Sequence, residues 1–261
     1  MSESILVRVD GPLARVTLNR PASLNAMDAD MAAQWRDAAR TATGEGIGAV
    51  ILDAAGPAFC AGGDVVSMAS FASGGADITA LARLINEGIR AFVDSSVPVV
   101  AAVQGAVAGG GLGLMLVADY IVASDQARFV SRYANIALTP DLGVTTLLPA
   151  AIGQRRALQL LLQDRMLTAA EALDWGLVAE TVAPDALAAR AEEVARFWLD
   201  GATGAFGQAK RLVRTGAGRT FAENLEDEAA TIGAAFGTPD AIARIAAFAA
   251  ASAQRSPGGT A

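Results

Sequence analysis

The N-terminal part of the chain shows the alternation of apolar and polar residues that is typical of β-strands. Ile5–Val9 and Arg15–Leu18 follow this pattern on either side of Asp10-Gly11-Pro12, and the turn residues between them predict a hairpin. A helix is predicted from Asp28, a suitable N-cap, to about Thr43, because apolar residues recur there with helical spacing.

Short apolar strands and helices follow one another over the next ninety or so residues. Strands are predicted at Ala49–Leu52, Val97–Val103, Tyr120–Ala123 and Phe129–Val130, and helices from about Asp64 and over Ile78–Phe92. The segment Gly105–Gly111 is predicted to be a turn that leads into a helix ending near Ala118. Such a succession is typical of an α/β fold with both faces of the sheet covered.

After about Leu142 the pattern is helical, with one strand near Val178–Val182. The predicted helices are Leu147–Ile152, Arg155–Gln163, Ala169–Trp175, Leu187–Leu199, Phe206–Thr215, Phe221–Phe236 and Ala241–Ala253. We therefore divide the chain into a core of residues 1–195 and a C-terminal helical region of residues 196–261, which suits packing or subunit contacts better than separate catalysis. The last residues, Ser256–Ala261, are expected to be frayed.

The composition allows a large core and disfavours two kinds of partner. Of the 261 residues, 53% are hydrophobic and 18% charged, so disorder is not expected. A net charge of −7 disfavours nucleic-acid binding. The uncharged stretch Ser95–Ala118 contains Pro98 and five glycines, which favours a buried strand, turn and helix over a membrane span. The N-terminus lacks the apolar segment of a signal peptide, so a cytoplasmic location is expected.

The sequence contains no histidine, and Cys60 is the single cysteine. Without histidine the chain lacks the commonest general base, the commonest metal ligand and every Ser-His or Cys-His pair. One cysteine forms no intramolecular disulfide or thiolate cluster, so we expect no metal site. Chemistry in this protein must use carboxylates, backbone N–H groups, hydroxyls, arginine or a borrowed cofactor.

Two glycine-rich segments each connect a buried strand to the start of a helix. They are Phe59–Asp64 and Gly105–Gly113. Each segment alone fits a simple tight turn as well as a ligand site, and neither has the spacing of a dinucleotide or P-loop motif. As a pair they can supply two converging N–H groups, which is how an oxyanion hole is built.

These segments belong to an ordered set that resembles the crotonase superfamily of enoyl-CoA hydratases and isomerases. The set is Asn19-Arg20-Pro21, Leu24-Asn25-Ala26, Phe59–Asp64, Gly105–Gly113, Asp119, Ala127-Arg128-Phe129 and Trp175–Val178. The resemblance covers nearly the whole chain. It implies a spiral of ββα units with a C-terminal helical trimerisation region, a homotrimer or dimer of trimers, and an acyl-CoA substrate with no cofactor beyond its coenzyme A moiety.

The resemblance also implies roles for particular residues. The N–H groups of Gly63 and Gly110 are expected to hold the enolate of the thioester. Backbone around Leu24, Ala26 and Ala61 is expected to hold the adenine end of coenzyme A. The other expected substrate contacts are Gly62, Asp64, Val65, Gly109, Tyr133 and Leu138.

Two carboxylates of the family's hydratases are missing from this chain. Gly113 and Tyr133 stand where those enzymes have the two glutamates that add water. Because two cooperating acids are the usual means of placing and activating water, the sequence disfavours ordinary hydratase chemistry.

Asp141 has two interpretations. The residues alone favour an N-cap, because Asp141 follows Pro140 and precedes a predicted helix. The resemblance favours a catalytic acid/base, because several isomerases and a dehalogenase of the family carry a functional carboxylate at this position. The dehalogenase mechanism also needs a histidine, which leaves an acyl-CoA isomerase, most similar to the 1,2-epoxyphenylacetyl-CoA and Δ3,Δ2-enoyl-CoA isomerases. The alternatives are a hydratase with a displaced acid and a catalytically silent acyl-CoA-binding protein.

Other candidate residues have simpler interpretations. Cys60 is expected to be a packing residue, Tyr133 to wall the acyl pocket rather than donate a hydrogen bond to substrate, and Asp64 to cap its helix. Lys210 and Arg211 are expected to lie on a solvated charged face, with contact to a coenzyme A phosphate as the alternative.

Overall fold

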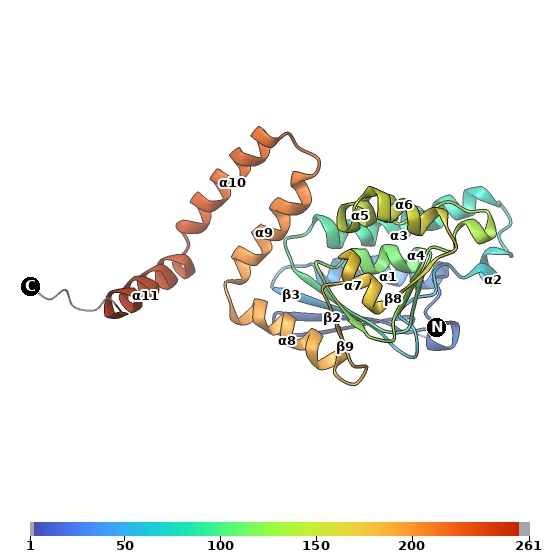
Figure 1. Ribbon diagram of the computed structural model, residues 1–261, viewed down its shortest axis with the longest axis horizontal. Coiled ribbons are helices and arrows are strands. Elements are labelled where there is room, and N and C mark those ends of the chain that lie inside the picture. Colours follow the sequence, from blue (N-terminus) through green and yellow to red (C-terminus); the bar gives the residue numbers. More distant parts are fainter. Residues whose placement is uncertain (1–2, 256–261) are drawn as a thin grey trace, which may run out of the picture.

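The computed structural model describes residues 3–255 and shows two β-sheets surrounded by helices (Figure 1). The six strands of the main sheet lie in the order β1-β2-β3-β4-β6-β9, and the smaller sheet has the order β5-β7-β8. The strands are β1 (Ile5–Asp10), β2 (Leu13–Leu18), β3 (Ala49–Ala54), β4 (Val99–Val103), β5 (Ala106–Ala108), β6 (Tyr120–Ser124), β7 (Arg128–Val130), β8 (Met166–Thr168) and β9 (Glu180–Val182).

Helices lie between and after these strands, close to where the apolar periodicity predicts them. They are α1 (Ala29–Ala42), α2 (Val65–Met68), α3 (Gly75–Asp94), α4 (Gly110–Leu116), α5 (Val144–Ile152), α6 (Gln154–Leu162), α7 (Ala169–Trp175), α8 (Leu187–Asp200), α9 (Thr203–Gly216), α10 (Phe221–Phe236) and α11 (Pro239–Arg255). The predicted α/β class is confirmed.

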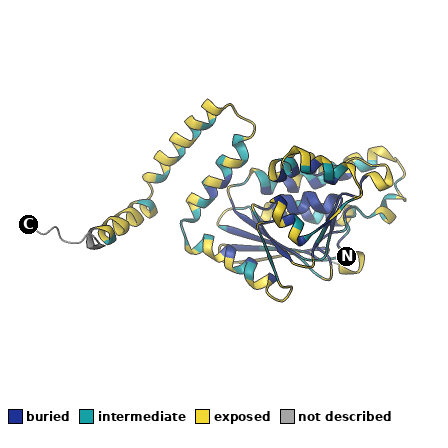
Figure 2. Cartoon of the chain, viewed as in Figure 1, coloured by how far each residue is buried: buried dark blue, intermediate teal, exposed yellow. Residues whose placement is uncertain are grey.

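Both faces of the main sheet are covered, because alternate residues of its central strands enter two different cores. Val50 and Leu52 of β3 pack in a core that includes α1 and α3. Ile51, between them, packs in a second core against α8. In Figure 2 the strands that lie between the helices of the core are largely dark blue, which marks them as buried. A strand buried on both faces reads as a continuous apolar run, which is why Ala49–Leu52 stands out in the sequence.

The predicted N-terminal hairpin and the first long helix are confirmed. Strands β1 and β2 pair antiparallel with Ile5 opposite Leu18 and Asp10 opposite Leu13. The Asp28 side chain accepts the N–H of Met31 at 2.8 Å and thereby caps α1.

Three short strands differ from the prediction. Residues 106–108, predicted to lie in a turn, form β5 and pair with β7. Strand β8 at Met166–Thr168 has no counterpart in the prediction, and β9 begins at Glu180 rather than Val178. Strands of three residues contain too few alternations to produce a period, so their pairing is decided by the neighbouring chain.

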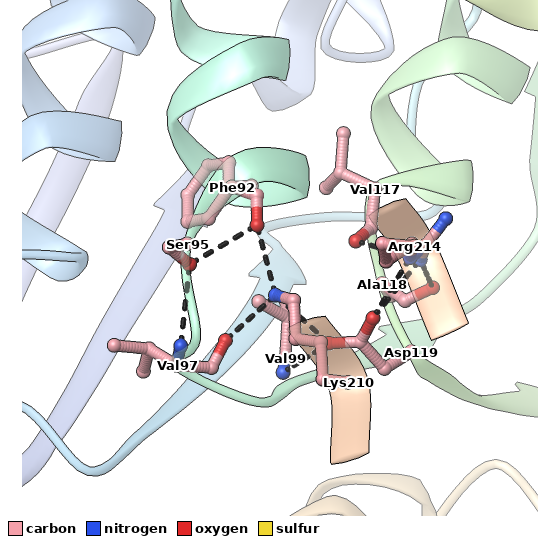
Figure 3. A network of polar contacts seen from close by, with 9 residues as sticks. All are labelled: Phe92, Ser95, Val97, Val99, Val117, Ala118, Asp119, Lys210 and Arg214. Carbon is pink, nitrogen blue, oxygen red and sulfur yellow. Dashed lines mark hydrogen bonds and ion pairs between the residues drawn. The ribbon is translucent and has the colours of Figure 1, made fainter. Parts of the chain in front are cut away.

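Lys210, expected on a solvated face, is instead buried and ties α9 to the core (Figure 3). Its Nζ donates to the backbone oxygens of Phe92 at 2.8 Å and Val97 at 2.7 Å, and pairs with Asp119 Oδ2 at 3.0 Å. Arg214, one turn along α9, pairs with Asp119 Oδ1 at 3.0 Å. Burial lowers the pKa of Lys210, and the facing Asp119 carboxylate opposes this shift. The expectation failed because every partner of Lys210 is distant in the sequence.

Arg211 also has a protein partner. Its guanidinium forms a bidentate ion pair with Asp227 of α10, with N–O distances of 2.7 and 3.0 Å. Helices α10 and α11 extend away from the core (Figures 1 and 2). Their exposed apolar side chains include Phe221, Ile232, Phe236, Ile242 and Phe248.

Two predictions concern the boundaries of the C-terminal region. The proposed division after residue 195 falls inside α8, whose buried residues pack on the sheet. The segment Ser256–Ala261, expected to be frayed, lies outside the described residues. Within residues 3–255, no helix is both long enough and apolar enough to cross a membrane.

Replacing Lys210 by methionine is expected to destabilise the protein strongly. The change keeps the length of the side chain but leaves two carbonyl oxygens and part of Asp119 without their donor. Removing one partner of a buried ion pair costs about 3–5 kcal/mol of unfolding free energy, measurable by chemical denaturation followed by circular dichroism. Arg90→Met is the control, because Arg90 is an exposed residue whose ion-pair partner among residues 3–255 is Asp94, and it should change stability by less than about 1 kcal/mol. Equal effects of the two changes would contradict this account.

Candidate active site

The two glycine-rich segments of the sequence lie against each other in the structure. The N–H of Cys60 donates to Ala106 O at 3.2 Å, and the N–H of Ala108 donates to Cys60 O at 3.0 Å. At Gly111, a Cβ atom would lie 2.3 Å from Cys60 O, which is far inside van der Waals contact. The two backbones therefore touch, and glycine is needed where they do.

Gly62 packs closely against the second segment, near the amide of Gly110. Its φ of +104° is rarely adopted by L side chains, and a Cβ there would lie 2.9 Å from Ala108 O and 3.5 Å from Gly110 N. The segment is held from its other side, because Met27 N donates to Gly62 O at 2.8 Å and Asp64 N to Met27 O at 2.9 Å.

The N–H groups of Gly63 and Gly110 remain available to a ligand. Among the hydrogen bonds of residues 3–255, neither amide has an acceptor. Both glycines line one cavity of about 540 Å³. Two free N–H groups on neighbouring turns, facing one cavity, have the construction of an oxyanion hole.

Nine of the predicted site residues line this cavity. They are Ala61, Gly62, Gly63, Val65, Gly109, Gly110, Tyr133, Leu138 and Asp141. Because these residues come from the two glycine segments, the start of α2 and the loop before α5, the fold brings together parts of the chain about eighty residues apart.

Leu24, Ala26 and Asp64 are not in the cavity wall. Leu24 adjoins it, because its carbonyl accepts the N–H of Ala61 at 3.0 Å. The Asp64 side chain caps α2 by accepting the N–H of Ser67 at 3.1 Å, which confirms the capping interpretation. That hydrogen bond, followed by contact with Arg20, lowers the pKa of Asp64.

Arg20 and Asn25 hold the segment before α1 in place through side-chain contacts. Arg20 pairs with Asp28 at 2.9 Å and with Asp64 at 3.1 Å. The buried Asn25 side chain donates to Ala55 O and Ala58 O and accepts the N–H of Arg20 at 2.7 Å. The sequence motif marked this segment, but the bracing role of its arginine appears only in three dimensions.

The loop that carries Asp141 fits onto a bare face of α4. Gly110 and Gly113 are three residues apart on this helix, and Leu142 lies on both. A Cβ at Gly113 would meet Leu142 O at 2.5 Å, and one at Gly110 would lie 3.0 Å from Leu142 Cδ1 and 3.9 Å from Asp141 Oδ1. The space for a side chain at position 113 is therefore occupied by the loop itself.

The N-cap interpretation of Asp141 is wrong. The N-cap of α5 is Gly143, which makes no side-chain cap, and Asp141 contributes only its backbone oxygen, to Val144 N at 3.0 Å. Its carboxylate Oδ1 instead accepts the hydroxyl of Tyr133 at 2.6 Å. Tyr133 thus both walls the cavity and donates a hydrogen bond.

The surroundings of Asp141 change its acidity in opposite directions. The carboxyl opens to the cavity, but the walls withdraw it partly from water, which raises its pKa, while the hydrogen bond from Tyr133 opposes this rise. Burial likewise raises the pKa of Tyr133, with a further contribution from the nearby carboxylate. Near neutral pH, Tyr133 is therefore the protonated donor and Asp141 the acceptor.

Cys60 is buried, and burial raises the pKa of its thiol to about 12. This agrees with a packing role rather than a nucleophile. Within residues 3–255, no group of three or more Asp, Glu or Cys side chains is arranged to hold a metal ion.

The sequence reasoning missed the cavity wall formed by α3. This wall includes Ile78, Leu81, Ala82, Ile85 and Asn86. The helical periodicity of this segment was evident, but an apolar stripe has the same pattern whether it faces a core or a ligand cavity.

Comparison with known proteins places this geometry in a family. The enoyl-CoA hydratase/isomerase family model matches residues 9–250. The chain is 35% identical over 258 residues to a Rhizobium meliloti (strain 1021) protein named "Probable enoyl-CoA hydratase", covering 94% of this chain and 95% of that protein. It is 32% identical over 231 residues to 1,2-epoxyphenylacetyl-CoA isomerase of Escherichia coli (strain K12), covering 87% and 88%.

Solved structures agree. The enoyl-CoA hydratase structure from Mycobacterium smegmatis superposes with a TM-score of 0.88 at 28% identity, covering 94% of this chain and 95% of that one. The chain belongs to the enoyl-CoA hydratase/isomerase family and has the crotonase fold, which confirms the resemblance found in the sequence.

Gly62→Ala is expected to separate the two turns or to unfold them. Gly46→Ala is the matched control, because Gly46 also has a positive φ, +82°, but has no atom within 4 Å of its Cβ position. The control should cost about 1–2 kcal/mol through backbone conformation alone. Gly62→Ala adds the clash with Ala108 O and should lower the free energy of unfolding further, by about 1 kcal/mol or more. Equal denaturation midpoints for Gly62→Ala and Gly46→Ala would show that the contact between the two turns leaves room for a side chain at position 62.

Proposed function

We propose that this protein is an acyl-CoA isomerase that moves a double bond, or rearranges an acyl group, through a thioester enolate. One observation carries the proposal: among the described residues that line the cavity, Asp141 is the sole carboxylate, and it shares that cavity with Gly63 and Gly110, whose amides have no partner among the described residues. This arrangement supplies one acid/base and two oxyanion donors, which are the groups that proton transfer next to a thioester requires.

The reaction proceeds in two proton transfers. The thioester oxygen accepts hydrogen bonds from Gly63 N–H and Gly110 N–H. Asp141 removes a proton from C2 or C4 of the acyl chain, and the electron pair of the broken C–H bond delocalises into a dienolate whose negative oxygen the two amides stabilise. The protonated Asp141 then returns the proton to the other carbon. Substrate and product are isomers, so no other reactant is consumed.

The backbone donors carry much of the catalysis in this scheme. Removing one oxyanion-hole donor from other enzymes costs about 3–4 kcal/mol of transition-state stabilisation. The raised pKa of Asp141 adds to this by making the carboxylate a better base.

The site favours isomerisation over hydration because neither position of a second acid is available. Leu142 occupies the space above Gly113, and Tyr133 uses its hydroxyl as a donor to Asp141. Relatives with hydratase names and with isomerase names are both similar to this chain, so a hydratase with a displaced acid and a silent acyl-CoA-binding protein are the alternatives that experiment must exclude.

The proposed acyl-CoA site extends to both sides of the two turns. The acyl chain is proposed to lie along the apolar α3 wall, where Leu81 and Ile85 line the cavity. Backbone around Leu24, Ala26 and Ala61 is proposed to hold the adenine end of coenzyme A. We propose no cofactor beyond that coenzyme A moiety, and a cytoplasmic location.

Asp141→Asn is expected to abolish double-bond migration while acyl-CoA binding persists. The amide oxygen of asparagine still accepts the Tyr133 hydroxyl but cannot take a proton from carbon. The assay incubates 3-enoyl-CoA with each protein and follows the absorbance of the conjugated enoyl thioester; binding of the same ligand is measured by calorimetry. Asp185→Asn, an exposed change, should behave as the wild type.

The same assay separates the alternatives. Turnover that survives in Asp141→Asn would refute the assigned base. Binding without turnover in the wild type would identify a silent protein. Addition of water to crotonyl-CoA would identify a hydratase.

We also propose that the chain forms a homotrimer or a dimer of trimers through its C-terminal helices. Among the residues of α10 and α11 whose burial is described, 221–252, none belongs to either hydrophobic core, and Phe248, Phe236 and Ile232 are 77%, 65% and 72% exposed. Apolar side chains exposed over two successive helices are a typical sign of a subunit interface.

Phe248→Asp is expected to weaken that assembly. A charge at an apolar interface loses its hydration without gaining a partner. The molar mass measured by light scattering should fall from three or six chains toward one as the protein is diluted. Val66→Asp places the same charge on α2 at an 85% exposed valine and should leave the assembly intact. A wild-type protein of one chain would contradict the proposal.

A further inference from the structure

We propose that Tyr133 is a positioning residue that orients the Asp141 carboxylate toward the acyl chain. The inference rests on the proposed function of Asp141. It adds Tyr133 to the site as a second functional side chain. The sequence marked Tyr133 as the replacement of a glutamate and as a wall of the acyl pocket, and neither interpretation connected it with Asp141.

The first argument is the contact itself. The Tyr133 hydroxyl donates to Asp141 Oδ1 at 2.6 Å, a length typical of a hydrogen bond to a charged oxygen. No other described residue donates to either oxygen of this carboxylate at hydrogen-bond distance. Tyr133 therefore occupies one oxygen, limits rotation of the carboxylate and leaves the other oxygen free for a proton from substrate.

The second argument is the backbone that brings the two side chains together. Between residues 132 and 142, three residues other than glycine have a left-handed conformation: Arg132 and Ala137 with φ of 58°, and Leu142 with 51°. Each costs about 1–2 kcal/mol relative to ordinary backbone. Such conformations persist where the surrounding structure enforces them, and they gather at functional sites.

The turn within this loop is fixed by the backbone of Tyr133. The Tyr133 carbonyl accepts the N–H groups of Ile136 at 3.2 Å and Leu138 at 3.1 Å. On the other side of the loop, Leu142 lies on the glycine face of α4. Both ends of the segment are thus anchored, and the meeting of Tyr133 with Asp141 does not depend on substrate.

Tyr133 does not act as a second acid. Burial and the neighbouring carboxylate both raise its pKa, so its proton is not released near neutral pH. The hydroxyl is a permanent donor, and a permanent donor stabilises the ionised form of Asp141. Its loss should raise the pKa of Asp141, because the hydrogen bond that most strongly opposes the effect of burial is then removed.

Tyr133→Phe tests the inference, with Tyr120→Phe as the matched control. Tyr120, the only other tyrosine, lies on β6 against the second core. Each variant is assayed with 3-enoyl-CoA across the pH range. The base works only when ionised, so kcat/KM falls as pH drops through the pKa of Asp141. For Tyr133→Phe we expect this acid limb to move up by about one pH unit, and kcat on the plateau to fall roughly tenfold with KM little changed.

A second measurement does not depend on turnover. The Asp141 carboxyl is titrated by carbon NMR in protein labelled at aspartate, and its signal is identified by its loss in Asp141→Asn. The titration should shift to higher pH in Tyr133→Phe and stay unchanged in Tyr120→Phe.

The outcomes distinguish this inference from the proposed function. A Tyr133→Phe enzyme with the wild-type pH profile, plateau kcat and carboxyl titration would overturn the role of Tyr133, while Asp141 could still be the base. Turnover retained by Asp141→Asn would overturn the proposed function, and the carboxyl titration would still decide whether Tyr133 controls the acidity of Asp141.

Discussion

The direct contact between two backbone turns is the constraint on which the site depends. Gly62 has no room for a side chain because Ala108 O lies 2.9 Å from its Cβ position. The contact brings two amides to the wall of one cavity, and the Arg20–Asp64 ion pair braces the first turn beside it. Catalytic stabilisation that comes from backbone N–H groups is pre-organised by folding itself, since the donors need no further ordering when substrate binds.

The position of the loop before α5 likewise depends on a glycine, because Gly113 has no side chain. Leu142 packs where a residue at position 113 would project, so the glycine that removes one carboxylate from the site also makes room for the loop that brings another. Tyr133 and Asp141 face each other across this loop at 2.6 Å. The structure therefore connects three features that look independent in the sequence: a missing glutamate, a tyrosine in place of a second one, and an isolated aspartate.

Much of the fold could be predicted from the pattern of residues. The hairpin over residues 5–18 has both the alternation of strands and a turn sequence, and α1 and α3 have long helical periods. The strands β5 and β8, with three residues each, were not predicted because pairing with β7 decides them. Lys210 was placed on the wrong kind of surface because its partners Phe92 and Val97 lie more than a hundred positions away.

For the site, the sequence alone determined which chemistry was available: no histidine, one cysteine, two glycine turns and a family order of motifs. It identified Asp141, and it left open whether that residue caps a helix. Only the tertiary structure decided this, by showing Gly143 as the cap and Tyr133 as the partner of the carboxylate. The physical reason is that side-chain chemistry is local to a residue, whereas orientation and acidity depend on neighbours that long-range packing and left-handed backbone bring into contact.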